Sequence, residues 1–130
     1  MANFEVERVA IEHVMQLERE AGRCPEDVHL RGVPYDIESP PRKIEVKAFS
    51  ESARGKAIPL EHRQFEAAKE DPDNYYVYVV DNVAGTPTAT AVRVLHGPSL
   101  RKLLDRCRPS TTYWPTFRTG EYDETEEGVD

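Results

Sequence analysis

The chain of 130 residues has few cysteines and no long apolar run. Cys24 and Cys107 stand far apart and lack the spacing of a metal-binding cluster, which indicates two reduced thiols in a cytoplasmic protein. No stretch of about 18 apolar residues occurs, so we expect neither a transmembrane segment nor a signal peptide. The four histidines are scattered and predict no zinc site. A disulfide-rich secreted scaffold and a membrane partner are therefore not expected.

An excess of basic residues is also missing. The chain has 17 lysines and arginines against 24 aspartates and glutamates, a net charge of −7. Six of the acids fall in the last ten residues, and without these ten the balance is 17 to 18, a net charge of −1. Such a near-neutral body permits contact with DNA but is unusual for a tight, stand-alone nucleic-acid binder. Length and charge predict one domain over residues 1–118 and a disordered acidic tail over residues 119–130.

Hydrophobic periodicity predicts an α/β chain. Helices are expected over residues 5–21, 61–70 and 99–105, and strands over residues 27–31, 35–38, 43–49, 75–80 and 88–95. The continuous apolar run at 75–80 is typical of a strand covered on both faces. Three early strands form a meander and the helix at 61–70 crosses over to the next strand, which gives a mixed sheet of about five strands flanked by helices. The restriction-endonuclease-like core has the same order of elements.

Aromatic residues gather near the C-terminus. We expect Tyr113, Trp114 and Phe117 to pack back onto the core, because large apolar side chains are usually buried. A role in stacking on nucleic-acid bases stays open as the alternative.

Three ionisable residues stand between apolar neighbours in two adjacent strand segments, Asp36 in the first and Glu45 and Lys47 in the second. With the period of two of a strand, Ile44 and Val46 point into the core while Glu45 and Lys47 share the opposite side. Such a set suits phosphodiester cleavage, because carboxylates hold a hard cation such as Mg2+ and an ammonium group steadies a water or a phosphate oxygen. An exposed sheet face with a cross-strand ion pair has the same spacing, so the spacing alone leaves both interpretations open.

Residues on two helices could join this set. Glu7 lies at the margin of the apolar stripe of the first helix, so it either faces the sheet or stays an exposed first-turn acid. Gln64 lies on the packed side of the helix at 61–70, where it either bonds backbone groups or points at the site. Basic residues cluster near the set in the sequence, and we predict nucleic-acid contacts for Arg42, Lys43, Arg54 and Lys56.

Ordered blocks of sequence over residues 5–100 resemble a known family. The blocks are Val-Glu-Arg-Val-Ala at 6–10, Glu18, Gly22, Pro-Glu-Asp-Val at 25–28, Tyr-Asp-Ile at 35–37, Ile-Glu-Val-Lys at 44–47 and the stretch at 73–80. Together they resemble the protein NO VEIN C-terminal domain family, which often stands at the C-terminal end of large helicases and of restriction or defence proteins. That family is similar to the PD-(D/E)xK nuclease superfamily, so the resemblance implies a restriction-endonuclease-like core.

The resemblance implies a role for each residue of the set. Asp36 and Glu45 would be the metal-binding carboxylates, and the backbone carbonyl of Val46 would be a further ligand. Lys47 would position and help activate the attacking water, and Glu7 would add an acid from the first helix.

The chain departs from the family pattern at three positions. Gln64 stands where the family usually has Glu, and several related nucleases carry Gln in this helix. Pro34 and Ala48 stand where the family commonly has Gly, which could alter how closely the backbone approaches DNA. None of these changes removes a metal ligand.

The function implied by the resemblance is hydrolysis of DNA by a Mg2+- or Mn2+-dependent endonuclease in restriction, defence or helicase-linked DNA processing. Its partners would be nucleic acid and a helicase or restriction-system subunit, and a homodimer is an open alternative to a monomer. A different class of function is also open, a non-catalytic module that keeps the nuclease fold and docks nucleic acid or a protein. A third interpretation is a soluble domain whose acidic rim only solvates a sheet.

Overall fold

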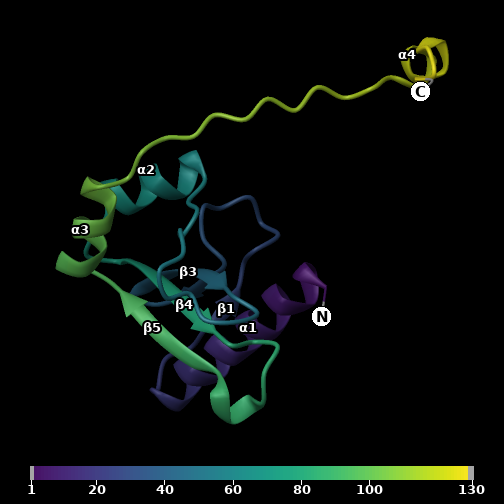
Figure 1. Ribbon diagram of the computed structural model, residues 1–130. Helices are drawn as coiled ribbons and strands as arrows, with labels where there is room; N and C mark the ends of the chain where they lie inside the picture. Colours follow the sequence, from purple (N-terminus) through teal and green to yellow (C-terminus); the bar gives the residue numbers. More distant parts are fainter. Residues whose placement is uncertain (1, 129–130) are drawn as a thin grey trace.

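The computed structural model describes residues 2–128 (Figure 1). Its helices are α1 (Asn3–Glu20), α2 (His62–Glu70), α3 (Pro98–Asp105) and α4 (Thr119–Glu124), with one 3-10 helix, η1 (Pro87–Ala89). Its strands are β1 (Glu26–Asp27), β2 (Ile37–Ser39), β3 (Arg42–Ala48), β4 (Tyr75–Asp81) and β5 (Ala91–Leu95). None of the helices in this part of the chain has the length and apolar character needed to span a bilayer.

The five strands form one sheet in the order β1-β2-β3-β4-β5. The first three form an antiparallel meander, β3 and β4 are parallel, and β5 returns antiparallel to β4. Parallel neighbours require a crossover connection, and α2 lies in the connection between β3 and β4. The predicted α/β class and the mixed sheet of about five strands flanked by helices are therefore confirmed.

Helix α1 covers one face of the sheet, because its apolar residues recur at helical spacing. The buried cluster on this face consists of Val6, Ala10, Ile11, Val14, Ile37, Ile44, Val46, Tyr78, Val80 and Val83. Ile44 and Val46 turn to this face together, as the period of two along β3 predicts. Glu45 and Lys47 therefore point to the other face of the sheet.

Helices α2 and α3 cover that other face (Figure 1). The buried cluster there consists of Ala68, Tyr75, Val77, Val79, Leu100 and Leu104. Strand β4 contributes residues to both clusters, so it is covered on both faces, as its continuous apolar run predicts.

Two strands are shorter than the sequence predicts. Strand β1 ends at Asp27, and residues 29–36 form turns and bends in which Gly32 has a φ of 74°. The Asp27 carboxylate accepts the His29 N–H and the Arg31 N–H donates to the Val28 carbonyl, so the chain already turns after Asp27, before it reaches Gly32. Strand β5 begins at Ala91 instead of residue 88, because Pro87 starts a 3-10 helix and has no N–H to donate to a sheet.

The prediction that the C-terminal aromatic residues pack onto the core is wrong. Tyr113, Trp114 and Phe117 are 86%, 85% and 64% exposed. Residues 107–128 are all exposed and lead away from the body of the molecule (Figure 1). Helices already cover both faces of the sheet, so the core is complete without these rings. Within the acidic tail, for which the sequence predicts disorder, residues 119–124 form the short helix α4, and the division into domain and tail stays a prediction.

Candidate active site

The candidate site begins where β2 and β3 separate. Their pairing ends at Ile37 and Ile44, and the Asp36 N–H still donates to the Ile44 carbonyl at 2.9 Å. Two residues further along β3, the Val46 N–H donates to Oδ2 of the Asp36 carboxylate at 2.9 Å. Burial raises the pKa of Asp36, although the bond from Val46 acts in the opposite direction. The Asp36 side chain therefore takes the place of a backbone partner for β3.

The Val46 carbonyl points toward the same gap between strands. The Lys43 N–H donates to the carbonyl of Asn74, the residue before β4, at 2.8 Å, so odd-numbered residues of β3 bond toward β4. The N–H and C=O of one strand residue point to the same side, and successive residues alternate. Val46 therefore directs both groups toward β2, and its carbonyl oxygen lies on the side of the Asp36 carboxylate.

Glu45 is buried on the α2 side of β3, with 4% of its surface exposed. Its Oε2 accepts a hydrogen bond from Gln64 Nε2 at 3.1 Å and forms an ion pair with Lys47 Nζ, also at 3.1 Å. Its Oε1 is also buried and has no hydrogen-bond partner among the described residues. Burial and the nearby charge of Asp36 raise the pKa of Glu45 to about 8, against the lowering effect of Lys47. Burial and the charge of Asp36 thus oppose ionisation of Glu45, even though Lys47 is at ion-pair distance.

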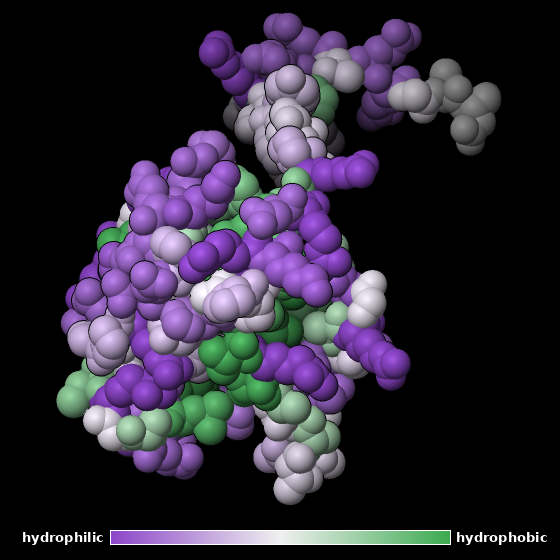
Figure 2. Space-filling view, turned by 90° about the vertical axis from the view of Figure 1, so that its left-hand side faces the viewer, coloured by the Kyte–Doolittle hydropathy of each residue, from purple (hydrophilic) through white to green (hydrophobic). Residues whose placement is uncertain are grey.

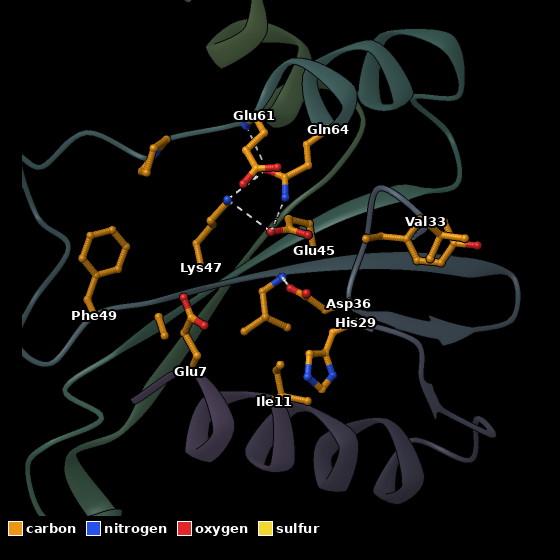
Figure 3. Close-up of a pocket in the computed structure, with 14 residues that line it drawn as sticks. Glu7, Ile11, His29, Val33, Asp36, Glu45, Lys47, Phe49, Glu61 and Gln64 are labelled. Atoms are coloured by element: carbon orange, nitrogen blue, oxygen red, sulfur yellow. Dashed lines mark hydrogen bonds and ion pairs between the residues drawn. The ribbon is translucent and has the colours of Figure 1, made fainter. Parts of the chain in front are cut away.

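Gln64 links this carboxyl group to the start of α2 (Figure 3). Its Oε1 accepts hydrogen bonds from Lys47 Nζ and from the Glu61 N–H, both at 3.0 Å. Gln64 therefore satisfies both interpretations of its sequence position, because it bonds a backbone group and also points at the site. Lys47 is held between two acceptors with only 15% of its side chain exposed.

These residues line a cavity of about 470 Å3 between α1, β3 and the start of α2. Glu7 of α1 lines the same cavity, and Figure 3 shows it beneath Lys47. Of the two interpretations of Glu7, the structure supports the one in which it faces the site. Glu7 is nevertheless exposed, and the structure gives it no ion pair within residues 2–128.

His29 also lines the cavity, and sequence reasoning missed it. The Asp27 carboxylate accepts the backbone N–H of His29 at 3.1 Å and contacts its ring Nδ1 at 2.5 Å. Figure 3 shows the imidazole ring below Asp36. The one signal in the sequence is the Asp-x-His pattern at 27–29, because Asp often bonds the backbone two residues later in a turn.

None of the four basic residues predicted to bind nucleic acid lines this cavity. Arg42 donates to a tyrosine hydroxyl of β4 at 2.6 Å, and Lys43 pairs with Asp71 at 3.3 Å. Arg54 and Lys56 are exposed on the loop between β3 and α2. Their contact with nucleic acid stays a prediction.

The donors present suit a hard divalent cation. Among residues 2–128 no three His, Cys, Asp or Glu side chains are grouped closely enough to hold a metal ion, so Glu7 does not complete a set with Asp36 and Glu45. Two carboxylates and the Val46 carbonyl offer the oxygen ligands that Mg2+ accepts, and Mg2+ usually keeps several waters besides. A buried acceptor without a donor costs about 1–3 kcal/mol, and a cation beside Glu45 Oε1 would remove that cost.

The fold and the site define an α/β domain with two carboxylates and a lysine where two strands separate. The chain belongs to the family described as Protein NO VEIN, C-terminal, whose model matches residues 6–94. The match runs from α1 to β5 and includes all the predicted catalytic and metal-binding residues, which confirms the resemblance found in the sequence. Comparison with curated proteins and with solved structures gives no match.

Proposed function

We propose that this domain is a Mg2+- or Mn2+-dependent nuclease that hydrolyses phosphodiester bonds of DNA, with Asp36, Glu45 and Lys47 at its active site. The observation that carries the proposal is the buried Oε1 of Glu45, which has no donor among the described residues and is accompanied by a second carboxylate. A buried acceptor without a donor is costly, and a cation bound between Glu45 and Asp36 would satisfy it, which supports the proposal.

Asp36, Glu45 and the Val46 carbonyl would hold the cation. When bound, Mg2+ or Mn2+ supplies Lewis-acid stabilisation of the charge that develops on the phosphate and helps to activate the attacking water. The protein supplies the fixed positions of these donors. Asp36 is held by the Val46 N–H, and Glu45 is held by Lys47 and Gln64.

Lys47 provides positive charge where the substrate phosphate would enter. Its ammonium group is largely desolvated and is oriented by two acceptors, Glu45 Oε2 and Gln64 Oε1. A positioned cation in a site shielded from water stabilises developing negative charge more strongly than a solvated one. Lys47 would therefore orient the attacking water or a phosphate oxygen, and Gln64 would act as the positioning residue behind it.

The family and the order of helices and strands indicate the process in which the domain acts. The order of helix, meander, crossover helix and two further strands is consistent with a restriction-endonuclease-like core, in which Asp36, Glu45 and Lys47 would be the PD-(D/E)xK residues. We accordingly propose that the domain acts with a helicase or a restriction system in DNA processing or defence, inside the cell.

Two observations favour a second candidate function. None of the predicted nucleic-acid-binding residues lines the cavity, and the body without its last ten residues has a net charge of only −1. Both features suit a non-catalytic module that keeps the fold and docks a nucleic acid or a protein. Such a module would need no divalent metal.

A cleavage assay on supercoiled, linear and single-stranded DNA separates these two functions. We expect cutting that requires Mg2+ or Mn2+ and is lost in Lys47→Ala. The matched control is Lys69→Ala, which removes the same charge from an exposed position on α2. Cutting by Lys47→Ala at the wild-type rate would contradict the assignment of the lysine. Metal-independent binding of DNA without cutting by the wild type would favour the docking module.

A further inference from the structure

A second hollow lies on the sheet, away from the candidate active site. It has a volume of about 360 Å3, and we call it the β5 groove. Its apolar lining consists of Ala53, Ile58, Val79 and Leu95. Two exposed arginines, Arg54 and Arg93, line it as well, and neither forms an ion pair with another described residue. The groove therefore combines an apolar floor with unpaired positive charge.

One acid also lines the groove, which leaves two positive side chains against one negative side chain. Asp81 is 8% exposed, and its carboxylate accepts the Ala53 N–H at 2.9 Å, which ties it to the loop between β3 and α2. Figure 2 views the side of the molecule on which α3 and β5 lie, and shows apolar surface framed by hydrophilic side chains. The tail projects from the top of the same view.

The C-terminal tail carries aromatic and acidic side chains, which complement the apolar floor and the arginines of the β5 groove. Residues 113–117 carry three exposed aromatic rings, and five acids follow within residues 121–127. Exposed aromatic side chains in such density mark interaction sites more often than free surface. The described structure gives them one partner only, the edge-to-face pair of Phe117 and Tyr122 at 5.6 Å.

We propose that the aromatic segment of one copy, residues 113–117, docks in the β5 groove of a second copy to form a dimer with reciprocal tails. The groove volume lies within the range of about 300–1,000 Å3 of pockets that bury a ligand, so it accepts an aromatic side chain such as Trp114. The acids that follow the segment meet Arg54 and Arg93 of the other copy, which adds charge complementarity to apolar contact.

The direction of the tail favours a second copy over the molecule's own groove. Residues 107–128 lead away from the body and are all exposed (Figure 1). Eight residues separate Asp105, at the end of α3, from Trp114, a reach of up to about 25–30 Å in an extended chain. This reach is long enough for the segment to contact a neighbouring copy, and the direction in which the tail leads selects the second copy. Reciprocal exchange of identical segments is a low-cost route to a closed, two-fold dimer.

Trp114 is the one tryptophan of the chain, so intrinsic fluorescence reports on the tail directly. With rising protein concentration we expect the mass from light scattering to double while the emission of Trp114 shifts to the blue. Arg93→Glu should weaken association by about tenfold or more. Arg19→Glu makes the same change of charge at an exposed position on α1 and should have no effect. An unchanged melting temperature checks that each variant folds.

A mixing experiment identifies the two contacting surfaces. A copy with Arg93→Glu keeps an intact tail, and a copy with Trp114→Ala keeps an intact groove. Each variant alone should associate weakly, whereas their mixture should form a heterodimer whose single tryptophan is blue-shifted. A blue shift independent of concentration would overturn the proposal in favour of docking within one molecule. The proposal would also be overturned if the fluorescence of Trp114 stayed that of a solvent-exposed ring at all concentrations, or if Arg93→Glu left the dimer unchanged.

Discussion

Two glutamates are buried on opposite faces of the same sheet, and their surroundings differ. Glu18 of α1 is 1% exposed, and it accepts two hydrogen bonds from Arg23, at 2.6 and 2.7 Å, and one from the Tyr78 hydroxyl at 3.0 Å. Burial alone would raise the pKa of Glu18, but the bonds from Arg23 and Tyr78 lower it below its usual value. Glu45 has an unpaired oxygen and a pKa raised to about 8.

The comparison separates a structural carboxylate from a functional one. Glu18 is ionised and satisfied by the protein itself, so its charge contributes to the fold. Glu45 has one oxygen without a partner, and burial beside Asp36 opposes its ionisation, so its environment suits a ligand that the chain does not provide. Burial alone, which is nearly the same for both, would not distinguish them.

The largest expected effect on stability comes from Glu18, the structural carboxylate. Glu18→Gln should lower the free energy of unfolding by about 3 kcal/mol, because removal of one partner leaves the other charge of a buried pair uncompensated. We take the low end of the usual range because the Arg23 side chain keeps 25% exposure. Urea denaturation measures the change, with Glu20→Gln, an exposed residue of the same helix, as the control. A loss below about 0.5 kcal/mol, the range of ordinary surface changes, would refute the structural role.

On the functional side, a divalent cation should stabilise the protein. At a Mn2+ concentration of about 100 times Kd the gain in unfolding free energy is about 2.7 kcal/mol, and it should vanish in Asp36→Asn. Since Glu45 must release its proton, affinity should rise between pH 6 and pH 8. Thermal melts with and without Mn2+ at both pH values test this, with the exposed Asp73→Asn as control. A shift that survives Asp36→Asn would show that the cation binds elsewhere.

The smallest expected effect is that of Glu45→Gln, which should raise the free energy of unfolding at pH 8, whereas Glu18→Gln should lower it. Because the folded pKa of Glu45 lies above its unfolded value of 4.5, the folded state holds the extra proton and stability falls as pH rises from 4.5 to 8. Glu45→Gln removes this loss, so without metal the variant should be as stable as the wild type near pH 5 and slightly more stable at pH 8. Denaturation curves at both pH values measure the difference. A variant clearly less stable than the wild type at pH 8 would mean that Glu45 supports the fold.

The parts of the fold that follow from local periodicity could be predicted. The alternation in β3 fixes which of its residues face α1, and the apolar run at 75–80 identifies the strand that is covered on both faces. Strand ends depended on single residues instead. The turn that begins at Asp27 shortens β1 and the 3-10 helix that begins at Pro87 shortens β5, and hydrophobic patterns describe neither.

The candidate site likewise contains residues that could be predicted from the sequence and one that could not. Glu45, Lys47 and Gln64 could be placed from the faces of a strand and a helix, and the structure brings them into contact. His29 lies on a loop whose path depends on turns, so no periodic signal led to it. The exposure of Trp114 could not be predicted from its hydropathy, because an apolar side chain can pack in a core or contact another molecule.

Gln64 couples the candidate site to the stability of the first turn of α2. The same Oε1 that accepts the Lys47 ammonium group also accepts the Glu61 N–H, so the first turn of α2 is held by a residue that belongs to the site. Any ligand that draws Lys47 or Glu45 away loosens Gln64, and the start of the helix then frays more easily. Amide hydrogen exchange at Glu61 would thus follow events at the cavity, and the helix end would act as a local sensor of occupancy.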